Sequence, residues 1–122
     1  MEKENIRNKN FFEAWKNAAS GIIFAIKTGK NLKIQICVAI IVIIFAICFK
    51  ATKIEWLFLI FAIMLVLICE TINTAIEQCV NLVTEEYSII AKRAKDVAAG
   101  AVVLASLNAV IIGIIIFTEK IF

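Results

Sequence analysis

The chain of 122 residues contains no proline and only four glycines, so the residues that most often interrupt helices are scarce. Its four cysteines are scattered singly through apolar segments, which excludes the close cysteine pairs of zinc and redox motifs. We interpret them as free, packed side chains. A P-loop is also absent, because Gly29-Lys30 has neither the preceding glycine nor the following hydroxyl.

Apolar residues dominate what remains. They make up 62% of the chain, whereas a soluble domain of this size would have about 45–50%. The composition therefore predicts one helical membrane domain over residues 1–122. The first residues, Met1–Asn5, are charged and polar and no short apolar core with a cleavage site follows, so we expect the N-terminus to be retained.

Three apolar segments are long enough to cross a bilayer, a task that takes about 17–25 residues. We predict transmembrane helices at about 33–50, 54–83 and 96–118. The second is longer than a span needs and should continue beyond the membrane. The third is rich in small residues that let neighbouring helices approach closely.

An amphipathic helix is predicted before these spans, at about 11–28. Apolar residues recur there with a spacing of three or four residues, which is typical of one helix face. Trp15 and the flanking lysines suit the headgroup region of a membrane. We therefore expect a helix that lies on the membrane surface.

Positive charge indicates the orientation of the spans. Of the 13 Lys and Arg residues, one side of the membrane would have Lys50, Lys53 and Lys120. The other would have Lys3, Arg7, Lys9, Lys16, Lys27, Lys30, Lys33, Lys92, Arg93 and Lys95. This bias places the N-terminus and the loop before the third span in the cytoplasm. The same bias, together with contact between the basic residues and anionic lipid, explains the net charge of +3. We therefore expect no nucleic-acid partner.

Glu70, Asn73 and Glu77 continue directly from the apolar part of the second span. Offsets of three and seven residues place them on one helix face. A carboxylate in hydrocarbon costs about 2.5–3.5 kcal/mol, so such acids indicate a functional site. The alternative is that protonated carboxyls act here only as hydrogen-bonded links between helices.

Further charged residues follow on the same side of the membrane. Glu85, Glu86 and Tyr87 lie in the next loop, and Lys95 and Asp96 begin the third span. Carboxylates can hold magnesium together with substrate phosphates. A lysine can neutralise phosphate charge, and a buried acid can accept a proton from a hydroxyl. These groups are the parts that a phosphoryl transfer needs.

Two segments resemble a known family. Glu70–Glu77 (ETINTAIE) and Ala94–Val102 (AKDVAAGAV) are similar to the two signature segments of the bacterial diacylglycerol kinases. The residues at these positions most resemble those of the undecaprenol kinase branch. The resemblance extends from about Phe12 to the end of the chain. It implies a homotrimer with a surface helix and three membrane helices per subunit, and active sites shared between subunits.

The resemblance also implies roles for individual residues. Glu70 would be the general base toward the lipid hydroxyl, and Asn73 its polar neighbour. Glu77 would bind the magnesium that accompanies ATP. The nucleotide would be bound by Glu77, Glu86, Tyr87, Lys95 and Asp96. Lys95 would also be catalytic, with its ammonium directed at phosphate.

Two positions depart from the family pattern. Gly29 stands where relatives have a metal-binding glutamate, and Asn81 replaces a common aspartate. Since glycine has no side chain to ligate a metal, we expect a weaker magnesium site or one that recruits another acid, such as Glu13.

The sequence thus predicts a multi-pass enzyme of the bacterial cytoplasmic membrane that phosphorylates a lipid alcohol with ATP and magnesium. Undecaprenol is the expected substrate, and diacylglycerol is the alternative. A different class of function is a membrane scaffold that keeps the fold but has lost metal binding through Gly29. A third is a proton carrier with Glu70 and Glu77 as relay sites.

Overall fold

The computed structural model describes residues 9–122. These residues form four α-helices and no strand: α1 (Phe11–Thr28), α2 (Lys30–Cys48), α3 (Lys53–Val83) and α4 (Ile89–Ile121). The predicted all-α architecture is confirmed. Met1–Asn5 and the basic residues Lys3 and Arg7 lie outside the described residues.

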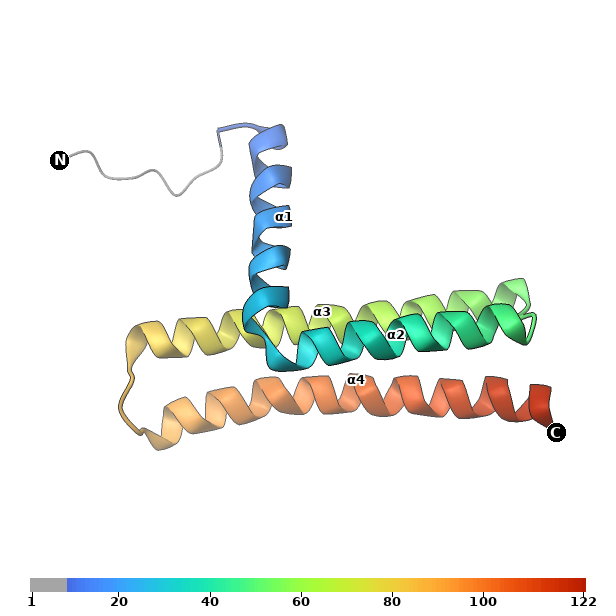
Figure 1. Ribbon diagram of the computed structural model, residues 1–122. Coiled ribbons are helices and arrows are strands. Elements are labelled where there is room, and N and C mark those ends of the chain that lie inside the picture. The colour runs from blue at the N-terminus through green and yellow to red at the C-terminus, as the bar shows by residue number, and fades with distance from the viewer. Residues whose placement is uncertain (1–8) are drawn as a thin grey trace.

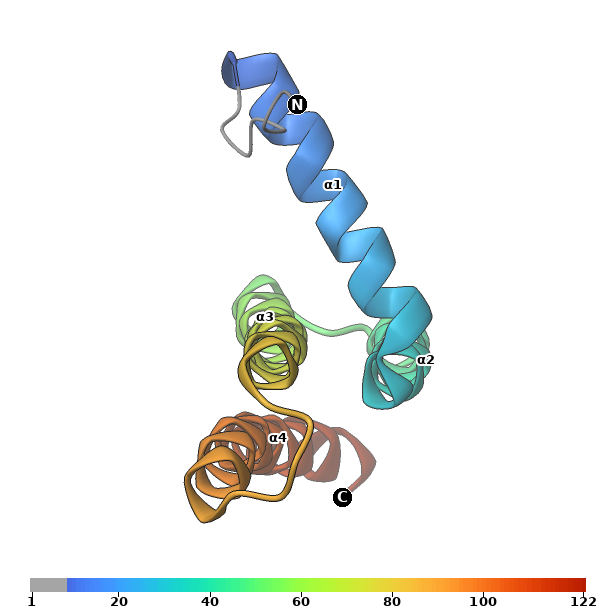
Figure 2. The ribbon, with the colours of Figure 1, turned by 90° about the vertical axis from the view of Figure 1, so that its left-hand side faces the viewer.

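Helices α2, α3 and α4 run up and down as a bundle, and α1 leaves it at a steep angle (Figure 1). Seen from one end, the three bundle helices occupy the corners of a triangle (Figure 2). Helix α3 packs along α4 and also contacts α2 and α1. An apolar groove of about 600 Å³ lies between α2 and α4, with Gln35 among its lining residues.

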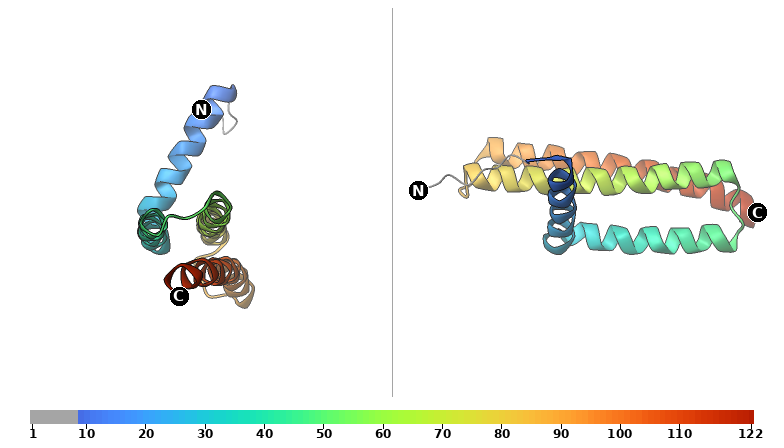
Figure 3. Two further views of the ribbon diagram at one scale, coloured as in Figure 1. Left: turned by 90° about the vertical axis from the view of Figure 1, so that its right-hand side faces the viewer. Right: turned by 90° about the horizontal axis from the view of Figure 1, so that it is seen from above.

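The lengths of the bundle helices differ in a way that suits a membrane. All three are long and apolar enough to cross one. At 1.5 Å per residue, α2 is about 28 Å long, close to the hydrocarbon thickness, whereas α3 and α4 reach about 46 and 50 Å. Because the connection from α2 to α3 is short, the excess length of α3 and α4 lies at the opposite end, beyond the start of α2 (Figure 3).

This arrangement corrects one expectation. The third helix does not begin at about residue 96: α4 already begins at Ile89, so Lys92 and Arg93 lie on the helix and not in the loop before it. Ser88 caps it by accepting a hydrogen bond from the Ala91 N–H. A search for apolar runs misses these first turns because they are polar and protrude beyond the membrane.

The end of the bundle at the α2–α3 turn, which we call the far end, is held together by apolar packing and by an ion pair. The buried residues Ala46, Leu59 and Ile116 form its core. An ion pair joins Lys120 Nζ to Glu55 Oε1 at 2.8 Å, and the Lys120 ammonium also donates to the Lys50 carbonyl. Glu55 thereby ties the start of α3 to the end of α4.

The same Glu55 belongs to the cap of α3. Its backbone N–H donates to the Thr52 hydroxyl, and the Thr52 N–H donates back to the Glu55 carboxylate. This reciprocal capping box fixes the start of the helix. The preceding turn contains Lys50 with φ 55°, a left-handed conformation that L-residues rarely adopt.

The burial of the cysteines agrees only in part with our interpretation of them as packed side chains. All four are free, as expected, but Cys37, Cys48 and Cys79 are exposed on the helix surfaces and Cys69 is half-buried. The interpretation is therefore wrong for the three exposed residues within a single chain.

Candidate functional site

The predicted site residues fall into two groups at the end of the bundle that includes the α3–α4 connection. The first group lies on α3, level with the first turns of α2, and contains Glu70, Asn73 and Glu77. Glu70 is only 3% exposed and Asn73 only 5%, whereas Glu77 is exposed. The shared face predicted from their spacing therefore passes from the packed interior of the bundle to its surface.

One hydrogen bond links this first group to α2, and another lies within the group. Gln35 Nε2 on α2 donates to Glu70 Oε2 at 3.4 Å. Asn73 Nδ2 donates to Glu77 Oε1, also at 3.4 Å. Two buried acceptors, Gln35 Oε1 and Asn73 Oδ1, have no donor among the described residues. Since buried polar atoms are nearly always paired, these two oxygens are free to accept hydrogen bonds from water, a ligand or a second subunit.

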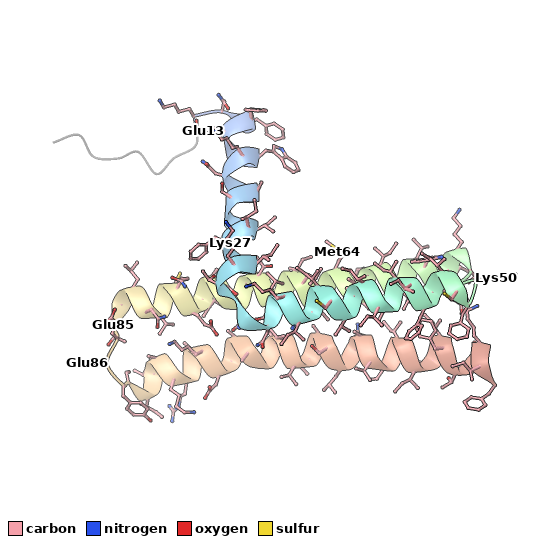
Figure 4. All side chains as sticks on the ribbon, in the orientation of Figure 1. Glu13, Lys27, Lys50, Met64, Glu85 and Glu86 are labelled. Carbon is pink, nitrogen blue, oxygen red and sulfur yellow. The ribbon has the colours of Figure 1, made fainter. Side chains whose placement is uncertain are left out.

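The second group lines a cleft of about 460 Å³ between the end of α3, the connecting loop and the start of α4. Its polar lining consists of Asn81, Thr84, Glu85, Glu86, Tyr87, Ser88, Lys92, Lys95 and Asp96. Four of the five residues predicted to bind the nucleotide thus line one cleft, whereas the fifth, Glu77, lies outside it. Figure 4 shows Glu85 and Glu86 at this tip of the bundle.

The charges of the cleft have different partners. Lys95 Nζ donates to the amide oxygen of Asn81 on α3 at 2.8 Å. Lys92 instead forms an ion pair with Asp96 at 2.6 Å, one turn along α4. Lys95 thus bonds to a neutral group, whereas the charge of Asp96 is balanced. A cation held by an uncharged partner remains available to an anion such as phosphate.

The loop of the cleft has a defined shape. The Thr84 hydroxyl accepts a hydrogen bond from the Glu86 N–H at 3.1 Å, which forms a tight turn after α3. Tyr87 follows with 80% of its surface exposed. An exposed aromatic ring beside a charged cleft offers a face on which a planar base can stack.

The two groups are neighbours along α3 but do not merge within one chain. Glu70, Asn73 and Glu77 are not part of the cleft lining. Eleven residues separate Glu70 from Asn81, which corresponds to about 16 Å along the helix axis. Glu77 lies between them, one turn before Asn81, and is the predicted residue best placed to connect the two groups.

Gly29 lies at the close contact between the α1–α2 junction and α3. A Cβ atom there would be 2.8 Å from the Ala25 carbonyl oxygen and 3.4 Å from Thr74 Oγ1. A larger residue would therefore require the junction to shift. Glycine at this position lacks the carboxylate that the family pattern predicts. It also allows the α1–α2 junction to lie close to α3.

Glu13 does not replace that carboxylate within the chain. It caps the first turn of α1, where it accepts a hydrogen bond from the Lys9 N–H and its own N–H donates to Asn10 Oδ1. Figure 4 shows Glu13 at the end of α1 remote from the bundle. The expectation that Glu13 is recruited is wrong for a single chain, because a helix of this length separates it from Glu77.

The remaining oxygens still fit a magnesium ion. In residues 9–122, no three acidic, His or Cys side chains gather closely enough to form a complete metal site. Magnesium, however, usually takes one or two carboxylates and completes its shell with substrate phosphates and water. The Glu77 carboxylate and the unpaired Asn73 Oδ1 beside it are oxygen donors of the required kind.

The structure adds residues to the site that sequence reasoning did not assign to it, and three of these carry an amide or a charge. Gln35 contacts Glu70, Asn81 contacts Lys95, and Lys92 lines the cleft. Asn81 had one signal, its departure from the family pattern. Lys92 entered the sequence argument only as one of the basic residues that indicate orientation. Gln35 also had a signal, because it is the one amide in the apolar run from Ile34 to Phe49.

Comparison with known proteins agrees with this picture. A sequence model of the family described as prokaryotic diacylglycerol kinase matches residues 16–117. An undecaprenol kinase of Bacillus subtilis (strain 168) is 34% identical over 122 residues, which cover 98% of this chain and 99% of that protein. A diacylglycerol kinase of Synechocystis sp. is 38% identical over 105 residues, which cover 85% of this chain but only 60% of that protein.

Proposed function

Because the chain belongs to the prokaryotic diacylglycerol kinase family, we propose that it transfers the γ-phosphoryl group of ATP to the hydroxyl of undecaprenol. One observation supports this most strongly: a buried carboxylate, Glu70, and a charged cleft lie at the same end of a membrane bundle. The first suits a substrate dissolved in lipid. The second suits a substrate that arrives from water.

The acceptor half of the reaction depends on Glu70. Its carboxylate accepts the proton of the lipid hydroxyl while the hydroxyl oxygen forms a bond to the γ-phosphorus. The bond from that phosphorus to the β,γ-bridging oxygen breaks, and ADP leaves with the electron pair. General-base assistance of this kind contributes about 10²–10⁴ in rate.

The donor half depends on the cleft. Lys95 neutralises charge on the phosphates, and Glu86, Tyr87 and Asp96 surround the rest of the nucleotide. Because the Lys95 ammonium is bonded to the Asn81 amide and not to a carboxylate, its full charge can stabilise the phosphate oxygens. In phosphoryl transfer, positioning and such charge stabilisation supply most of the catalysis.

Glu77 and Asn73 are the residues proposed to hold magnesium. When bound, magnesium would offset the negative charge of the phosphates. Glu77 is exposed and lies between the buried group and the cleft, so its carboxylate is accessible from the aqueous side. With Gly29 in place of a second carboxylate, a higher magnesium concentration is expected for half-maximal turnover.

A homotrimer with shared sites is part of the proposal. The separation of Glu70 from the cleft within one chain leaves room for a second subunit to complete the path between lipid and nucleotide. The cleft would face the cytoplasm of a bacterial cell, where ATP is present. The bias of basic residues toward this side of the membrane supports the same orientation.

Undecaprenol is preferred to diacylglycerol because the Bacillus relative that matches nearly the full length is named for undecaprenol. The test is phosphate transfer from labelled ATP by the purified protein in mixed micelles, with the two lipids in parallel and magnesium titrated. Faster turnover on undecaprenol is the expected result. Faster turnover on diacylglycerol would show that diacylglycerol is the preferred substrate and would keep the proposed reaction. No turnover on either lipid would contradict the proposed activity.

A further inference from the structure

Gln35 is a polar residue at the start of an apolar helix. From Ile34 to Phe49 it is the one side chain that carries an amide or a charge. An amide without a partner is unfavourable in hydrocarbon, so its presence there requires an explanation. The structure provides one, because Gln35 Nε2 donates to the buried Glu70 carboxylate on the neighbouring helix.

We propose that Gln35 is a positioning residue that holds the Glu70 carboxylate in the orientation needed to accept the proton of the lipid hydroxyl. This inference rests on the proposed kinase function. The bond occupies Glu70 Oε2 and so restricts rotation of the carboxylate. Proton transfer depends strongly on such alignment, since donor and acceptor must lie within hydrogen-bond reach.

The chemical nature of Gln35 suits this role better than that of a charged residue. A lysine or arginine at the same place would bind the carboxylate strongly and reduce its ability to accept a proton. A neutral amide restrains the carboxylate while leaving its negative charge uncompensated. Leucine would be compatible with the membrane but would leave the carboxylate unrestrained.

The unpaired oxygen of the same amide adds a second argument. Gln35 Oε1 is buried and has no donor among residues 9–122. A glutamine amide can present either its N–H or its oxygen to a neighbour. It can therefore donate to Glu70 when the carboxylate is ionised, and accept from Glu70 after the carboxylate has taken up the hydroxyl proton.

The test compares two variants of similar size. Gln35→Met removes the donor but keeps an unbranched side chain, and it should lower kcat by about tenfold to a hundredfold, the effect of losing a hydrogen bond to a charged group. The KM for ATP should stay unchanged, because the cleft is remote. Gln35→His keeps an N–H donor and should retain turnover within about threefold of the unchanged protein. Cys37→Ala, an exposed position on α2, is the control for general effects of substitution in this helix.

A double variant separates positioning from packing. In a Glu70→Gln background, Gln35→Met should reduce the residual turnover by less than about twofold, because the carboxylate that it positions is gone. An undiminished kcat in Gln35→Met, or an equal loss in the Met and His variants, would overturn the role of Gln35 while the kinase function stands. Absence of lipid phosphorylation by the unchanged protein would overturn both.

Discussion

The two ends of the helical bundle both combine acids with lysines, but they pair them differently. At the far end, Glu55 and Lys120 form a direct ion pair at 2.8 Å, and each side chain is only 18% exposed. At the site end, Glu70 and Lys95 are bonded to the amides of Gln35 and Asn81.

The difference shows how the fold separates stability from reactivity. An ion pair between helices holds them together but satisfies both charges. An amide partner fixes the direction of a charged group without cancelling its charge, which leaves that group able to act on a substrate. The Lys92–Asp96 pair in the cleft is an exception at the site end. Its side chains are 56% and 61% exposed, so the two charges offset each other less than those of Glu55 and Lys120.

The largest effect is expected from removing the charge of the buried acid. Glu70→Gln should lower kcat by about 10²–10⁴, because the hydroxyl loses its proton acceptor. Thermal unfolding in detergent should change little, since an amide can still bond to Gln35. Measured turnover within tenfold of the unchanged protein would exclude Glu70 as the general base.

A smaller but still large effect is expected at the cation of the cleft. Lys95→Met should reduce kcat/KM for ATP by about tenfold to a hundredfold, because a charge-assisted contact to phosphate is lost. Lys92→Met is the matched control and should cost less, since Lys92 is engaged with Asp96. A larger loss in the Lys92 variant would reverse the assignment of the two lysines.

Replacing the neutral partner of Lys95 should have a moderate effect. Asn81→Asp would turn the hydrogen bond into an ion pair that competes with phosphate, so we expect the KM for ATP to rise by about three- to tenfold. The kcat with saturating ATP should stay nearly constant. Steady-state kinetics over a range of ATP concentrations would measure this, and an unchanged or lower KM would argue against the importance of a neutral partner.

At the far end the expected effect is on stability. Glu55→Gln breaks the ion pair with Lys120 and weakens the capping box, which should lower the melting temperature of the protein. Turnover at moderate temperature should remain. Thermal unfolding in micelles, with the exposed Glu119→Gln as control, would detect the difference, and equal melting temperatures of the two variants would contradict it.

The smallest effect is a gain in stability in the turn between α2 and α3. Lys50 has φ 55°, which costs about 1 kcal/mol or more for an L-residue and nothing for glycine. Lys50→Gly relieves this strain but also raises the conformational entropy of the unfolded chain, which offsets part of the gain. The net stabilisation of the protein should be about 0.5–1 kcal/mol. Lys53→Gly, within the first turn of α3, should instead destabilise it.

Much of the fold could be predicted from the sequence because apolar runs and polar caps are local signals. The same signals could not reveal which side chains meet between helices. Helix α4 is apolar on nearly all sides, so its sequence does not state which face packs on α3. The Asn81–Lys95 contact depends on that packing face of α4. The Gln35–Glu70 contact depends in the same way on the rotation and register of α2 against α3.

The resemblance to a family fills part of this gap, since it marked Glu70, Asn73, Glu77 and Lys95 without any geometry. It could not find Gln35, which lies outside both motifs. Nor could it show that Glu13 is engaged at the far end of α1, because the partner of a cap is visible only in the folded chain.

The most direct measurement compares Glu70→Gln and Glu55→Gln in one assay of phosphate transfer from labelled ATP to undecaprenol, together with their thermal unfolding. Glu70→Gln should lose turnover and keep its stability, whereas Glu55→Gln should lose stability and keep its turnover. If both variants lost turnover to the same extent, or if the Glu55 variant alone lost it, the division between a reactive and a structural end of the bundle would be wrong.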